Sequence, residues 1–187
     1  MSADGDQLSQ WRAYCKPADG YAIGFDSVAL RAAAEKRHFL LPCEYDEAAQ
    51  AQLLDKLLNE VEADFHRNRR MTSLDVCALG ASGYFIIAFH MVAPMLKHKA
   101  FVDEQEWRLV TKPFAEPVPA GHRPAPTLLV PFTECAYAVE GAPSPIAEIV
   151  VGPTPHGDLE LRAVKSLQKR LGLQAAVRLS VVPYRPW

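Results

Sequence analysis

Two glutamates, Glu104 and Glu106, are the residues of this chain best suited by type and spacing to do chemistry. They stand two apart in a segment that predicts a β-strand, so alternation should turn both carboxylates to one face. Trp107 and Leu109 should then point to the other face, toward a core. Two acids on one strand face suit a catalytic surface. The same pattern also fits an edge strand with a solvated face, on which Glu106 pairs with Arg108.

Three residues near the N-terminus are candidate binding groups: Trp11, Arg12 and Tyr21. Arg12 is suited to binding a pyrophosphate, because a guanidinium binds phosphate bidentately. It also fits a structural arginine that bonds a nearby carboxylate or carbonyl. Trp11 and Tyr21 are suited either to stacking on a ring or to packing in the core. The residues alone leave each of these alternatives open.

Length and charge set the class of protein. A chain of 187 residues predicts a single domain over residues 1–187 that is long enough to bury a core. The net charge of −2 provides no global basic field, so nucleic acid is not indicated as a partner. A basic run at residues 66–70 is interpreted as a solvated helix end rather than a nucleic-acid patch.

The four cysteines, Cys15, Cys43, Cys77 and Cys135, form no CxxC pair, and no secretory signal precedes them. Scattered single cysteines are typical of a reducing cytoplasm, which is the predicted location. The six histidines lack HExxH or similar ligand spacing, so no metal site is expected.

The order of the predicted elements indicates an α+β fold, with a mixed, mainly antiparallel sheet from both chain ends and a helical middle. Residues 1–7 are expected to be loose, and residues 113–126, rich in Pro, Ala and Gly, form an exposed loop in this prediction. The predicted strands are residues 21–26, 39–45, 127–132, 146–151 and 176–182. The predicted helices are a short one after Asp26, residues 46–70, roughly 72–97, and 158–171.

One predicted helix contains a long uncharged stretch. Residues 76–96 contain no Asp, Glu, Lys or Arg, but Gly80, Gly83, His90 and Pro94 dilute their hydrophobicity. A spanning helix needs about 20 strongly apolar residues. The stretch is therefore interpreted as a central buried helix rather than a membrane span, and no membrane partner is expected.

Ordered sequence blocks give a first resemblance. The blocks are LSQWRAY at 8–14, GYAIGFD at 20–26, EQEWRLV at 104–110, VGP at 151–153 and SVVPYR at 180–185. Their order resembles a bacterial family of uncharacterised proteins that carries a domain-of-unknown-function label. Family members usually have a further upstream strand segment, and the resemblance implies that this strand is missing here.

A more distant resemblance concerns chemistry. An aromatic strand with small residues followed by a late Glu-x-Glu strand is similar to the ADP-ribosyltransferase superfamily. The resemblance implies that Glu106 contacts the nicotinamide ribose of NAD and that Glu104 engages the acceptor. It further implies that Arg12 meets the pyrophosphate and that Tyr21 or Trp11 stacks on a ring.

The resemblance therefore implies a domain that binds NAD and cleaves the nicotinamide–ribose bond, acting as a bacterial toxin or defence effector. NAD would be its substrate, no metal would be needed, and the macromolecular acceptor is left unassigned. One alternative is a non-catalytic interaction module of the same fold in a stress or defence system. Another is an enzyme acting on a different nucleotide with the same acid pair.

Overall fold

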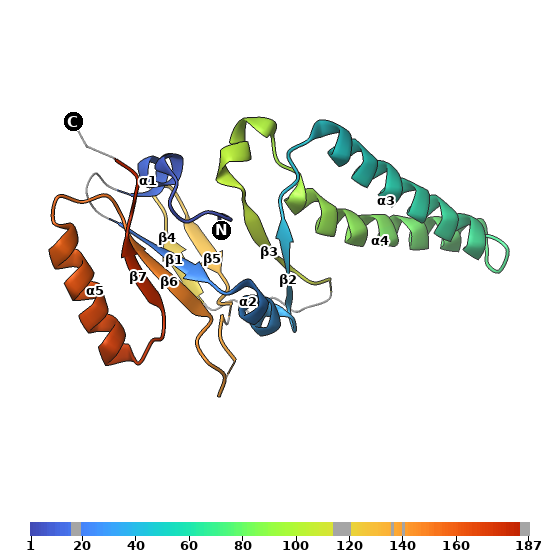
Figure 1. Ribbon diagram of the computed structural model, residues 1–187. Coiled ribbons are helices and arrows are strands. Elements are labelled where there is room, and N and C mark those ends of the chain that lie inside the picture. Colours follow the sequence, from blue (N-terminus) through green and yellow to red (C-terminus); the bar gives the residue numbers. More distant parts are fainter. Residues whose placement is uncertain (16–19, 114–120, 136, 140, 184–187) are drawn as a thin grey trace. The chain divides into compact units, whose positions relative to one another are not determined.

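A computed structural model describes residues 1–15, 20–113, 121–135, 137–139 and 141–183 of the chain (Figure 1). The chain divides into two compact units. The first, called here the hairpin unit, consists of Met1 and His38–Ala115. The second, called the sheet unit, consists of Ser2–Arg37 and Glu116–Trp187. Each unit is described by itself.

The hairpin unit is built on a two-stranded sheet. Strands β2 (His38–Pro42) and β3 (Trp107–Thr111) pair antiparallel, with Leu40 opposite Leu109. Leu40 and Val110 are buried. The chain between the strands forms the helices α3 (Glu47–Asn68) and α4 (Leu74–Val92) and the 3₁₀ segments η1 (Ala93–Met95) and η2 (Lys99–Glu104).

Helices α3 and α4 run side by side as an antiparallel pair (Figure 1). Helix α3 begins at the predicted place because the Asp46 side chain accepts a hydrogen bond from the backbone N–H of Ala49 at 2.8 Å. Helix α4 ends at Val92, short of the predicted end near residue 97. Pro94 follows at once, and a proline cannot supply the backbone donor that continues an α-helix.

The prediction that α4 is a central buried helix was wrong. Cys77 is its buried residue, and large apolar side chains along it stay exposed within the hairpin unit. α3 is the helix that packs along it, so one side of α4 is covered. Among the described residues, Leu74–Met95 is the helical segment that is long and apolar enough to cross a membrane by length and composition.

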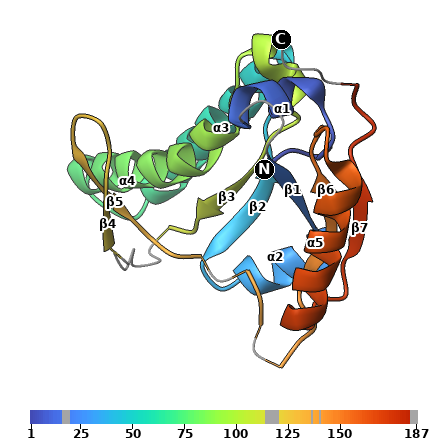
Figure 2. The ribbon, with the colours of Figure 1, turned by 90° about the vertical axis from the view of Figure 1, so that its left-hand side faces the viewer.

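The sheet unit is centred on three strands in the order β1 (Tyr21–Phe25), β6 (Ile146–Val151) and β7 (Ala176–Leu179). β1 pairs antiparallel with β6, and β6 pairs parallel with β7. The parallel pair needs a crossover, which helix α5 (Gly157–Leu171) supplies. Figure 2 shows α5 lying along β6 and β7. The central strand β6 ends in Val150 and Val151, which are fully buried.

Smaller elements complete the sheet unit. Helices α1 (Leu8–Tyr14) and α2 (Ser27–Ala34) flank β1 in the sequence, and Asp26 caps α2 as predicted. Strands β4 (Gly121–Pro124) and β5 (Leu129–Phe132) form a separate antiparallel hairpin. The predicted exposed loop over 113–126 was therefore wrong at residues 121–124, because their backbone pairs with β5. Residues 114–120 of that loop, and Tyr184 and Arg185 of the SVVPYR block, lie outside the described residues.

The α+β class is confirmed, with small antiparallel sheets and helices. Strands β1, β6 and β7 come from the two ends of the sequence, as predicted. The helical pair α3 and α4 comes from its middle, also as predicted.

Candidate functional site

The two glutamates do come together, but not by strand alternation. Glu104 ends the 3₁₀ segment η2, and Glu106 lies just before β3, so the prediction of one strand through both residues was wrong. Gln105 between them adopts a left-handed conformation with φ of 41°, which reverses the local direction of the chain. A turn therefore brings the two carboxylates to the same place.

Lys97 lies between the two carboxylates. Its Nζ is 2.5 Å from Oε2 of Glu104 and 2.5 Å from Oε2 of Glu106. The Lys97 side chain is largely buried, and the two glutamate side chains are less than a third exposed. Both acids are thus held by one cation in a partly desolvated setting, where a charge-assisted hydrogen bond is stronger than in water.

Arg108, two residues further along on β3, binds the same glutamate. Its Nε donates to Oε1 of Glu106 at 3.0 Å and its Nη2 to Oε2 at 2.9 Å. A third donor, Nη1, reaches the carbonyl of Pro94 at 2.7 Å. This is the pairing of Glu106 with Arg108 that the solvated-face interpretation predicted. We call Lys97, Glu104, Glu106 and Arg108 the acid-pair cluster.

The cluster fixes the charge of Glu106. Hydrogen bonds from Arg108 lower the pKa of Glu106 to about 2, burial opposes this shift, and Lys97 adds to it. Burial by itself would lower the pKa of Lys97, but hydrogen bonds to Glu104 and Glu106 raise it above its usual value. Glu106 is therefore an ionised carboxylate and Lys97 an ammonium at neutral pH.

A pocket of about 480 Å³ opens beside the cluster. Glu106, Trp107 and Arg108 line it together with the rest of β3, and Met1 and Pro94 complete the wall. Met1 is held there because its ammonium donates to the carbonyl of Trp107 at 3.0 Å. The pocket thus offers the carboxylate of Glu106 and the guanidinium of Arg108, which are hydrogen-bonded to each other.

Sequence reasoning missed three residues around the acids. Lys97 holds both carboxylates, the Tyr45 hydroxyl accepts a hydrogen bond from the Glu106 backbone N–H at 2.8 Å, and Cys43 Sγ lies 3.9 Å from Glu106 Oε2. Burial raises the pKa of the Cys43 thiol, which makes it a poor nucleophile. The signal that sequence reasoning passed over was a lysine seven residues before the first acid.

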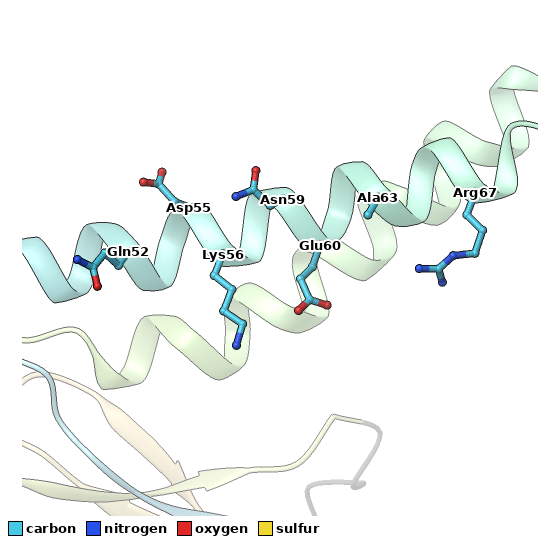
Figure 3. A pocket seen from close by; sticks show the side chains of 7 residues that line it. All are labelled: Gln52, Asp55, Lys56, Asn59, Glu60, Ala63 and Arg67. Carbon is cyan, nitrogen blue, oxygen red and sulfur yellow. The ribbon is translucent and has the colours of Figure 1, made fainter.

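A second hollow, of about 530 Å³, lies on α3. Figure 3 shows that its lining side chains all come from this one helix, so no second element forms an opposing wall. The side chains carry both signs of charge along the helix surface. They are Gln52, Asp55, Lys56, Asn59, Glu60, Ala63 and Arg67. This hollow is a polar helix surface rather than a closed site.

The three predicted binding residues, Trp11, Arg12 and Tyr21, belong to the sheet unit, whereas the acids belong to the hairpin unit. Trp11 is only 3% exposed and is a core residue. Arg12 lies on α1 with an exposed side chain. The Tyr21 hydroxyl donates to the carboxylate of Glu160, and its ring is about half exposed.

A second ionic cluster holds the sheet unit together. The Asp6 carboxylate accepts hydrogen bonds from Trp11 Nε1 at 2.9 Å, Arg178 Nη1 at 2.9 Å and Ser180 Oγ at 2.5 Å, and from the backbone N–H of Val181. Arg178 also binds Glu148 at 2.7 Å. We call Asp6, Trp11, Glu148, Arg178 and Ser180 the chain-end cluster. It anchors part of the segment 1–7 that was expected to be loose.

Metal binding has no support in the part of the chain that the structure describes, because no group of three or more His, Cys, Asp or Glu residues there is placed to hold an ion.

Comparison with known proteins identifies the family but no activity. No curated protein and no solved structure matches the chain. The sequence matches the DUF2971 family, described as "Protein of unknown function", over residues 10–109, which is more than half of its length. The match runs from the LSQWRAY block to Leu109 and includes the whole acid-pair cluster. The chain therefore belongs to the DUF2971 family.

Proposed function

We propose that this protein binds NAD and cleaves its nicotinamide–ribose bond, in the manner of an ADP-ribosyltransferase. The observation that carries the proposal is the state of Glu106: a carboxylate held ionised, beside a second acid, at the wall of a pocket. On this proposal the protein acts in the bacterial cytoplasm as a toxin or defence effector.

The chemistry requires negative charge at a fixed place. When the bond from ribose C1′ to the nicotinamide nitrogen breaks, its electron pair leaves with nicotinamide, and positive charge develops on the ribose. A carboxylate bonded to the ribose hydroxyls stabilises that charge. Glu106 suits this role because its low pKa keeps it ionised. Glu104 takes the proton of the acceptor hydroxyl or water as the new bond to C1′ forms.

The cations position the acids in this scheme. Lys97 contacts both carboxylates and sets the distance between them. Arg108 holds Glu106 through two hydrogen bonds, and such a paired geometry fixes the carboxylate plane. The proposal rests on these residues of the hairpin unit, whereas Arg12 and Tyr21 belong to the sheet unit. Trp11, being buried, supports the fold around them.

The test is incubation of the full chain with NAD and measurement of released nicotinamide. We expect release by the wild-type protein and a loss of at least 100-fold in Glu106→Gln, the size typical of removing a group that stabilises transition-state charge. Asp103→Asn, an exposed acid one residue before Glu104, is the matched control and should keep full activity. Absence of release by the folded wild-type protein contradicts the proposal.

A second candidate function is favoured by the completeness of the ion pairs. Both acids already have cationic partners, as expected of a non-catalytic interaction module in which the cluster supports the fold. In that case NAD stays intact, and Glu106→Gln lowers the unfolding temperature without changing any turnover. Measuring both quantities on the same three proteins separates the two functions.

A further inference from the structure

The outer side of α4 carries a regular row of residues that are exposed, apart from Gly83, which is half-buried. Val76, Leu79, Gly83, Ile86 and His90 follow one another at alternating spacings of three and four, and we call this row the α4 seam. The side chains of Val76, Leu79 and Ile86 are 58%, 76% and 54% exposed. At 100° per residue the row lies roughly opposite Cys77, the buried residue of the helix.

This spacing is the pattern by which one helix packs against another. Apolar residues at alternating intervals of three and four form the contact row of a coiled coil. Within its unit α4 already contacts α3 on the other side, through the face that includes Cys77. The α4 seam is therefore a second helix-packing surface, separate from the one that α3 occupies.

Gly83 sits at the middle of the seam. A Cβ placed on it would meet no atom within 4 Å, so nothing in the unit requires a glycine there. Glycine inside a helix is also destabilising relative to alanine. At a contact between two helices, however, a glycine lets the backbones approach closely.

We propose that the α4 seam binds the α4 seam of a second copy of this chain, in an antiparallel pair centred between Ser82 and Gly83. Leu79 and Ile86 lie at equal distances from this point along the helix, so they face each other in both directions. Asp75 and His90 also lie at equal distances from it. The apolar centre of the row therefore matches itself under a two-fold axis, as an interface between identical subunits must.

Charge favours a second copy over a lipid surface. Asp75, next to Val76, is the acidic residue of α4, and it lies at the opposite end of the helix from His90. Antiparallel pairing sets Asp75 of each copy beside His90 of the other. The His90 Nδ1 already contacts the Ile86 carbonyl at 2.8 Å, which leaves Nε2 to meet the carboxylate. In a lipid the carboxylate would be desolvated without such a partner.

The first experiment measures the mass of the full chain in solution by light scattering and by sedimentation over a range of concentrations. We expect a dimer that dissociates on dilution, because the seam is short, roughly 21 Å at 1.5 Å per residue. Leu79→Glu should shift the dissociation constant at least 100-fold toward monomer. Leu58→Glu, at an exposed leucine on α3, is the control and should leave it unchanged. Circular dichroism checks that both variants fold.

The second experiment tests the antiparallel arrangement. His90→Glu sets two acids against each other at both ends of the pair and should weaken the dimer at least 10-fold. Adding Asp75→Lys to it should restore the wild-type dissociation constant. The two positions are fifteen residues apart on one helix, so they cannot compensate within a single copy.

Three results would overturn the proposal. One is a wild-type protein that stays monomeric at every concentration. Another is a dimer that Leu79→Glu, and Ile86→Glu as a second variant, leave intact. The third is a monomer that sediments with vesicles of phosphatidylcholine and phosphatidylserine and loses them on Leu79→Glu, which would assign the seam to a membrane surface.

Discussion

The acid-pair cluster and the chain-end cluster both pair carboxylates with cationic side chains, but they have different structural roles. In the hairpin unit, Lys97 and Arg108 hold Glu104 and Glu106 at the wall of a pocket, and the whole cluster comes from one short segment of the chain. In the sheet unit, Asp6 binds Arg178 and Ser180, which are 172 and 174 residues away. One cluster shapes a surface, and the other joins the two ends of the chain.

The two clusters also differ in how deeply their carboxylates are buried. The Asp6 side chain is 6% exposed, whereas that of Glu106 is 22% exposed. Burial works against ionisation of Asp6, but hydrogen bonds from Ser180, Val181, Trp11 and Arg178 together lower its pKa. A carboxylate with four donors and almost no solvent is a structural anchor. A carboxylate that keeps access to a pocket can still meet a ligand.

The largest expected effect comes from breaking the chain-end cluster. Asp6→Ala leaves the donors of Trp11, Ser180 and Arg178 without their acceptor and should lower the free energy of unfolding by about 3 kcal/mol. Urea denaturation followed by tryptophan fluorescence measures it. Asp4→Ala, an exposed acid two residues away, should cost less than about 1 kcal/mol. Equal losses for both variants would mean that Asp6 is no anchor.

Removing the shared cation of the acid-pair cluster should have a smaller effect. Lys97→Met keeps the aliphatic stem but leaves Glu104 and Glu106 facing each other, and we expect a loss of about 2 kcal/mol. The matched control is Lys99→Met. Its pair with Glu47, at 3.0 Å, is more than two thirds exposed on both sides, so the change should be about 0.3 kcal/mol or less. A Lys97→Met protein as stable as wild type would mean that the ion pairs of the cluster do not contribute to the free energy of unfolding.

Acid provides a third test, aimed at Glu106 alone. Its folded pKa of about 2 lies below the usual 4.5, so its contribution to stability is present above pH 4.5 and is lost as pH falls toward 2. After allowance for partial exposure, we expect this loss to be about 1.5 kcal/mol. Unfolding curves of wild type and Glu106→Gln between pH 6 and 2 should converge as pH falls. Parallel curves would contradict the ionic role of Glu106.

The smallest effect is expected at Gln105, between the two acids. Its left-handed backbone is strained for a residue with a Cβ, so Gln105→Gly should stabilise the protein by about 0.5–1 kcal/mol. Gln105→Val should destabilise it, because a branched Cβ fits that conformation poorly. Thermal unfolding of the two variants gives opposite shifts if the turn is as described. Shifts of the same sign would argue for a different local conformation.

Local signals in the sequence were sufficient for several elements. The apolar spacing of residues 46–70 predicted α3, and the structure gives Glu47–Asn68. The last helix was predicted to end at residue 171, and α5 ends there, capped by Gly172 in a left-handed conformation. In both cases the deciding interactions lie within one helical turn of the residue concerned, so a short window of sequence contains them.

Other features depend on residues that no short window contains. Arg178 and Val181, which bind Asp6, come from the far end of the chain, and no pattern in segment 1–7 predicts them. The apolar composition of α4 led to a wrong prediction of burial, because composition does not say what covers a helix. Period-two alternation around the acids was also misleading, because one left-handed residue, Gln105, interrupts it.

That single left-handed residue has a consequence for how the segment can vary. In a strand, exchanging one residue leaves every neighbour on its face, and losing one residue turns all later side chains over. Here the acids share a cation only because one residue of unusual backbone separates them. A deletion or an added residue at 105 would part them, whereas a change of residue type would not. The spacing Glu-x-Glu is therefore a length constraint: a redesign of this surface must keep one residue between the acids, and that residue must tolerate a left-handed backbone.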